Sequence, residues 1–121
     1  MEMEVRYRVI KEHVRSYDEP LKLRAGERVT VGRQDTKWVS WFWCTNLLGI
    51  GGWVPESILG YRDASSAVVT VNYNSIELTI ASGELVVGCH SFEGWIWCKK
   101  GPNEEGWVPL ENLLRVHDRL D

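Results

Sequence analysis

The stretch "EEGWVPLENLL", residues 104–114, contains a Gly-Trp-Val-Pro tetrad that also occurs in "GGWVPESIL", residues 51–59. The similarity extends beyond the tetrad, because two further pairs of segments align without a gap. These pairs are "PLKLRAGERV" (20–29) with "ELTIASGELV" (77–86), and "WFWCTNLLGIGGWVP" (41–55) with "WIWCKKGPNEEGWVP" (95–109). Self-similarity over this length indicates one structural unit that is present twice.

The two copies read as short β-strands, because β-branched and aromatic residues alternate over a few positions between Gly, Asn, Asp and Pro. No stretch shows a convincing helical period. We predict strands at 5–11, 27–33, 38–45, 50–55, 58–62, 67–72, 84–90, 94–100, 105–109 and 113–117. Five short strands per copy favour a strongly bent antiparallel barrel, since closure removes exposed edges. The expected fold is therefore all-β, with two five-stranded antiparallel β-barrels at 1–62 and 63–121, connected through "GYRDASS" (60–66).

Alternation along the strands assigns side chains to the two faces of each barrel, because neighbouring side chains point in opposite directions. If the small Cys44 and Cys98 point inward, so do Phe42 and Ile96, and the tetrads place Val54 and Val108 inside. The indoles left outside are those of Trp41, Trp43, Trp53, Trp95, Trp97 and Trp107. Each copy is thus expected to carry an external cluster of tryptophans. Such a cluster must be covered by a partner or by the other domain.

Composition narrows the possible functions. The chain has 121 residues, 44% hydrophobic and 26% charged, with a formal charge of −3, so we expect a folded protein that does not bind nucleic acid. We find no membrane-length apolar run and no secretory leader, which makes the cytosol the expected location. Three cysteines fit reduced thiols, and their spacing with the histidines matches no zinc template. No catalytic constellation is present, so neither an enzyme nor a bound cofactor or metal is expected.

The order of the elements resembles that of the SH3 domain. Each copy has an early strand, then a long loop that ends in Leu-x-apolar-x-x-Gly-Glu. A Trp-led strand with a small residue three places on comes next, followed by Gly-Trp-Val-Pro and a short turn. The pattern occurs twice, and it is similar to that of the variant SH3 domains of bacterial proteins. The resemblance implies tandem SH3-like barrels that bind peptide or protein partners without catalysis.

The resemblance also implies two ligand grooves. In the first copy the matching residues are Trp41, Trp53 and Pro55, with Asp18 and Glu19 in the loop after the first strand. In the second copy they are Trp95, Trp107, Pro109, Glu77 and Tyr73. Lys11 and His13 stand where the family has tyrosines, and Ile58 and Asn112 replace the last tyrosine of the motif.

With most tyrosines replaced, a polyproline ligand loses the rings between which its ridges dock. The indole pair beside an acid persists, and it could hold an Arg or Lys side chain by cation–π attraction and charge pairing. We therefore expect a peptide or protein ligand that is basic or aromatic before one that is proline-rich. Three alternatives stay open: a glycan ligand stacked on the indoles, an RNA ligand, and burial of one indole cluster between the domains. Oligomeric state is not determined by these patterns.

Overall fold

The protein is described from a computed structural model, in which residues 4–117 are placed. The chain divides into two compact units. Unit 1 combines residues 4–16 with 77–117, and unit 2 is the continuous segment Tyr17–Ile76. The prediction of an all-β fold with two five-stranded antiparallel sheets is confirmed, with one sheet in each unit.

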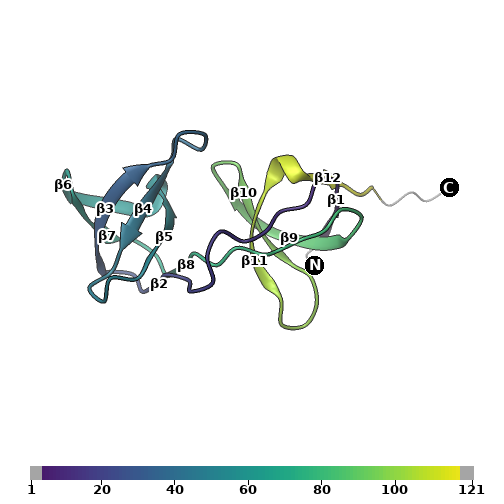
Figure 1. Ribbon diagram of the computed structural model, residues 1–121. Helices are drawn as coiled ribbons and strands as arrows, with labels where there is room; N and C mark the ends of the chain where they lie inside the picture. The colour runs from purple at the N-terminus through teal and green to yellow at the C-terminus, as the bar shows by residue number, and fades with distance from the viewer. Residues whose placement is uncertain (1–3, 118–121) are drawn as a thin grey trace. The chain divides into compact units, whose positions relative to one another are not determined.

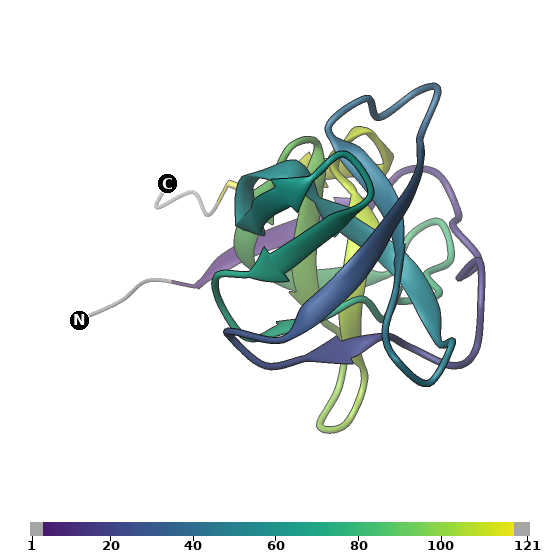
Figure 2. The same cartoon turned by 90° about the vertical axis from the view of Figure 1, so that its left-hand side faces the viewer.

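Unit 2 contains a sheet with the strand order β5-β4-β3-β7-β6. Its strands are β3 (Arg28–Gln34), β4 (Trp41–Thr45), β5 (Gly51–Pro55), β6 (Leu59–Asp63) and β7 (Ser66–Val69). A 3-10 turn, η1 (Glu56–Ile58), joins β5 to β6, and a two-residue ladder pairs β2 (Lys22–Leu23) with β8 (Tyr73–Asn74). Figures 1 and 2 show these strands bending around one interior.

Unit 1 repeats this arrangement with the order β11-β10-β9-β1-β12. Its strands are β1 (Val5–Val9), β9 (Leu85–Phe92), β10 (Trp95–Lys99), β11 (Glu105–Pro109) and β12 (Leu113–Arg115). The 3-10 turn η2 (Leu110–Asn112) joins β11 to β12 (Figure 1). All ten predicted strands are therefore observed, with ends that shift by up to three residues.

Matching backbone hydrogen bonds show that β7 occupies in unit 2 the place that β1 occupies in unit 1. Val69 N donates to Glu27 O at 2.9 Å, and Val9 N donates to Glu84 O at 2.8 Å. Gly26 N donates to Val69 O and Gly83 N to Val9 O, both at 2.7 Å. The duplication seen in the sequence is thus a duplication of hydrogen-bond pattern.

The first strands are exchanged relative to the order of the chain. β1 pairs with β9 and β12, which belong to the second sequence copy, whereas β7 pairs with β3 and β6 of the first copy. The predicted division into 1–62 and 63–121 therefore differs from the units that form. "GYRDASS" is the β6–β7 hairpin within unit 2, where Gly60 faces Val68 and Asp63 faces Ser66, so it does not connect two barrels.

Burial confirms the predicted interior except at two indoles and at Phe42. Cys44, Cys98, Val54 and Val108 are all 0% exposed and Ile96 is buried, whereas Phe42 is half-buried. Trp41 and Trp107, which were expected to face outward, are only 4% and 3% exposed. The groups that cover Trp107 include the aromatic rings of His90, Phe92 and Trp97. An outward-facing indole can therefore still be buried by its neighbours on the sheet.

The exchange can be tested by crosslinking. Arg8 faces Leu85 across the β1–β9 ladder, and the equivalent pair in unit 2 is Val68 and Arg28. In a Cys89→Ser background, R8C/L85C should form a disulfide within one chain on mild oxidation, because facing residues of two strands lie within disulfide reach. Non-reducing electrophoresis and peptide mapping detect the bond.

The matched control is R8C/R28C, which can be bridged only if β1 closes the barrel of its own sequence copy. It should stay reduced under the same conditions. Crosslinking of R8C/R28C instead of R8C/L85C would contradict the exchange, and a covalent dimer of R8C/L85C would place the exchange between two chains.

Candidate functional site: the aromatic surfaces of the two units

Unit 2 carries an aromatic cluster on the outer face of β4 and β5, which we call the Trp43–Trp53 cluster. The two indoles face each other across the ladder, with ring centroids 5.3 Å apart and planes at 77°. Tyr17 packs edge-on against Trp43 at 5.6 Å. The guanidinium carbon of Arg33 lies 5.2 Å from the Trp43 ring centroid and 5.1 Å from that of Trp53. These four residues define the cluster.

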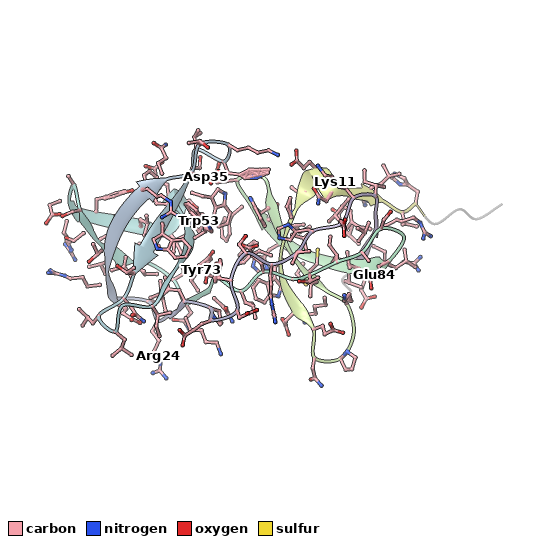
Figure 3. All side chains as sticks on the ribbon, viewed as in Figure 1. Lys11, Arg24, Asp35, Trp53, Tyr73 and Glu84 are labelled. Atoms are coloured by element: carbon pink, nitrogen blue, oxygen red, sulfur yellow. The ribbon has the colours of Figure 1, made fainter. Side chains whose placement is uncertain are left out.

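Hydrogen bonds and close packing hold these rings in place. The Tyr17 hydroxyl donates to Ser75 O at 2.6 Å and accepts from Trp53 N at 3.4 Å. The Tyr73 hydroxyl donates to Trp53 O at 2.6 Å, and Figure 3 labels both residues. Gly51 leaves room for Trp43, because a Cβ at Gly51 would lie 2.6 Å from the indole. The cluster is therefore a preformed surface.

Unit 1 has a corresponding cluster. Trp97 and Trp107 face each other at 5.4 Å and 84°. His90, which pairs with Trp97, stacks on that indole at 6.3 Å and 7° and meets Trp107 edge-on at 5.4 Å. Phe92 lies 5.9 Å from Trp107, and Trp97 Nε1 donates to Glu105 Oε1 at 2.9 Å. In the repeat alignment His90 takes the position of Arg33.

The residues predicted for the first groove all lie in unit 2. Trp53 is half-buried, Trp41 and Pro55 are buried, and Asp18 and Glu19 are exposed directly after Tyr17 in the chain. Tyr73 joins them, although it was predicted for the second groove. The strand exchange is the reason, because Tyr73 follows β7 into unit 2 and His13 follows β1 into unit 1.

Four of the residues predicted for the second groove lie in unit 1, namely Trp95, Trp107, Pro109 and Glu77. Trp95 is half-buried and meets His13 edge-on at 5.4 Å. Pro109 is buried opposite Trp95 in the β10–β11 ladder. Trp107 is covered, as described above. This groove thus exposes less aromatic surface than the sequence predicted.

Glu77 is engaged inside unit 1. Its carboxylate is 5% exposed, and Oε1 accepts hydrogen bonds from Ser16 N and Ser16 Oγ, both at 3.0 Å. His13 Nε2 lies 3.0 Å from the same oxygen. Asn112, in the place of a family tyrosine, donates through Nδ2 to Lys11 O at 3.2 Å and to Glu12 O at 3.1 Å. The side chains of Glu77 and Asn112 therefore hold the segment that follows β1.

Sequence reasoning missed three residues of the Trp43–Trp53 cluster, namely Tyr17, Arg33 and Trp43. Alternation had placed Trp43 outward, but the family groove contains no residue at that position. Arg33 gave no local signal, because its approach to the indoles comes from the pairing of β3 with β4 across a register irregularity between Val31 and Gln34.

The buried thiols offer no reactive group. Burial raises the pKa of Cys44 to about 12, and burial followed by the nearby Cys89 raises the pKa of Cys98 to about 12. Both thiols are therefore protonated at neutral pH.

Among residues 4–117, no three His, Cys, Asp or Glu side chains converge as metal ligands would. Within the same range, the helices are too short and polar to cross a membrane.

The raised thiol pKa values predict a loss of stability at alkaline pH. Above the ordinary value of 9.0 the unfolded chain releases thiol protons that the folded chain keeps. The free energy of unfolding should therefore be unaffected below pH 9 and fall as the pH approaches 12. Urea titrations across this range measure the slope. A Cys44→Ala/Cys98→Ala variant should show a shallower slope, and an identical slope would contradict the assignment.

Replacing Glu77 distinguishes a structural acid from a ligand-binding acid. Glu77→Ala leaves the donors of Ser16 and His13 without their acceptor, so we expect a loss of about 1 to 3 kcal/mol in the free energy of unfolding. Glu104→Ala, at an exposed glutamate, is the control and should change stability by less than about 1 kcal/mol. Unchanged stability of Glu77→Ala together with lost peptide binding would instead support the ligand role.

Comparison with known protein families gives one match. Residues 6–60 match the family model described as a variant SH3 domain. No curated protein and no solved structure matches the chain. The matched stretch begins in β1 of unit 1 and ends in β6 of unit 2, so it spans the exchange. A variant SH3 domain is a non-catalytic fold and indicates a protein-interaction module.

Proposed function

We propose that the protein binds a basic segment of a peptide or protein partner over the Trp43–Trp53 cluster of unit 2. The observation that carries this proposal is the position of Arg33, whose guanidinium lies 5.2 and 5.1 Å from the centroids of the two indoles. The surface therefore already accommodates the chemical group that a basic ligand would bring. A cation over an indole face contributes about 0.5 to 2 kcal/mol.

The surroundings of the cluster support a basic ligand. Asp18 and Glu19 are exposed and directly follow Tyr17, which packs against Trp43. Carboxylates beside an aromatic surface favour the approach of cationic peptides and disfavour acidic ones. Because the rings are held by hydrogen bonds of Tyr17 and Tyr73, little ordering is needed when a ligand binds.

Polyproline recognition has less support. Ile58 stands where the SH3 pattern has its last tyrosine, Tyr73 is buried with its hydroxyl donating to Trp53 O, and Trp41 is also buried. The rings between which a PxxP ligand docks are therefore missing or covered. The rings that meet on the outer face of β4 and β5 are instead those of Trp43 and Trp53, which are half-buried.

Fluorescence titration of the full chain tests the proposal. Short blocked peptides with Arg-Arg pairs should change the tryptophan emission and bind more tightly than matched PxxP or acidic peptides. Trp43→Ala should weaken this binding at least about fivefold, the loss expected for one exposed cation–π contact of about 1 kcal/mol. Urea denaturation confirms that the variant is folded.

Trp97→Ala is the matched control, because it removes the equivalent indole from unit 1 and should leave binding to the Arg-Arg peptides unchanged. Binding of PxxP peptides alone, or of an oligosaccharide or RNA probe in place of the basic peptides, would overturn the proposal. Basic peptides that bind Trp43→Ala as well as the unmodified chain would also overturn it.

A further inference from the structure

We infer that Arg33 occupies the position of the ligand's own arginine and that a partner arginine binds by displacing it. This inference rests on the proposed function and concerns the regulation of the same site. Arg33 Cζ is almost equally far from two ring centroids whose planes are at 77°, so one flat guanidinium meets both indoles at once. An arginine side chain from a partner would make the same contacts.

The side chain of Arg33 is held weakly. Among residues 4–117, the side chain of Arg33 forms no hydrogen bond and no ion pair, and its contacts with aromatic groups are those with Trp43 and Trp53. The side chain is exposed. Arg33 is therefore retained by cation–π attraction alone, which is weak enough for an exposed guanidinium to be exchanged for another.

Unit 1 holds a different side chain at the position equivalent to Arg33. His90 aligns with Arg33 and stacks on Trp97 beside Trp107. Both sheets thus cover the cross-strand indole pair with a nitrogen-bearing side chain from the neighbouring strand. Such a cover shields the indoles from water while no ligand is bound, and it must move before a ligand can contact their faces.

The cationic group that a ligand should carry follows from the chemistry of Arg33, which lies over the indoles when no ligand is bound. A planar guanidinium can lie on one indole face while its edge meets the second ring, whereas the ammonium group of lysine is a compact and strongly hydrated charge. The site should therefore prefer arginine to lysine. Arg33 lowers the affinity for arginine ligands and for lysine ligands, because either ligand must displace it.

The test compares affinities of Arg-Arg peptides for the full chain and for Arg33→Ala. Removal of the internal occupant should tighten binding by about 2- to 30-fold, the range that corresponds to a cation–π contact of about 0.5 to 2 kcal/mol. Arg33→Lys should bind with intermediate affinity. Matched Lys-Lys peptides should bind each protein more weakly than the Arg-Arg peptides do.

Arg62→Ala controls for the change in net charge, because it removes one exposed arginine from β6 of the same unit. It should tighten binding by less than Arg33→Ala does. Equal effects of the two variants would show a charge effect only and would overturn the inference. Weaker or unchanged binding by Arg33→Ala would overturn it as well, while leaving the proposed function intact if the unmodified chain still binds. The absence of binding by all of these proteins would overturn both.

Discussion

Closure of each sheet by a first strand from the other sequence copy is the constraint on which the rest of this structure depends. β1 completes the sheet of β9 to β12, and β7 completes the sheet of β3 to β6, through equivalent hydrogen bonds at Val9 and Val69. A barrel of this size leaves unpaired edges if one strand is lost. In unit 1 the closing strand comes from far away in the sequence, whereas in unit 2 it follows β6 directly through a hairpin.

The exchange also decides which side chains meet at each surface. Tyr73 follows β7 and bonds to Trp53 O in unit 2, whereas His13 follows β1 and meets Trp95 and Glu77 in unit 1. The two units consequently present different chemistry on similar frames. In unit 1 the acid predicted for a ligand is engaged with the segment that follows β1, and Trp107 is covered by neighbouring rings. In unit 2 the indoles of Trp43 and Trp53 are half-buried, and two exposed acidic residues directly follow Tyr17 of the same cluster.

Arg33 connects this surface to the proposed function. Its guanidinium lies over two indoles without an ion pair among the described residues, so the cluster is covered by a weakly held group of the protein itself. Such an arrangement keeps apolar rings out of water and favours ligands that carry the same group. It also links affinity and specificity, because a partner must offer contacts with the indoles that are at least as good as those of the Arg33 that it replaces.

The sequence alone determined the local features of this protein. Period-two alternation located all ten strands of the two sheets and placed Cys44 and Cys98 inside, because strand formation and face assignment depend on neighbouring residues. Only the tertiary structure decided which first strand closes which sheet, since β1 and β7 share one pattern and either sheet could pair with either strand. The contacts of Arg33 and Glu77 were also decided only by the tertiary structure, because their partners lie on segments that only folding brings together. Strand pairing is a non-local interaction, and a repeated pattern makes its alternatives equivalent in sequence.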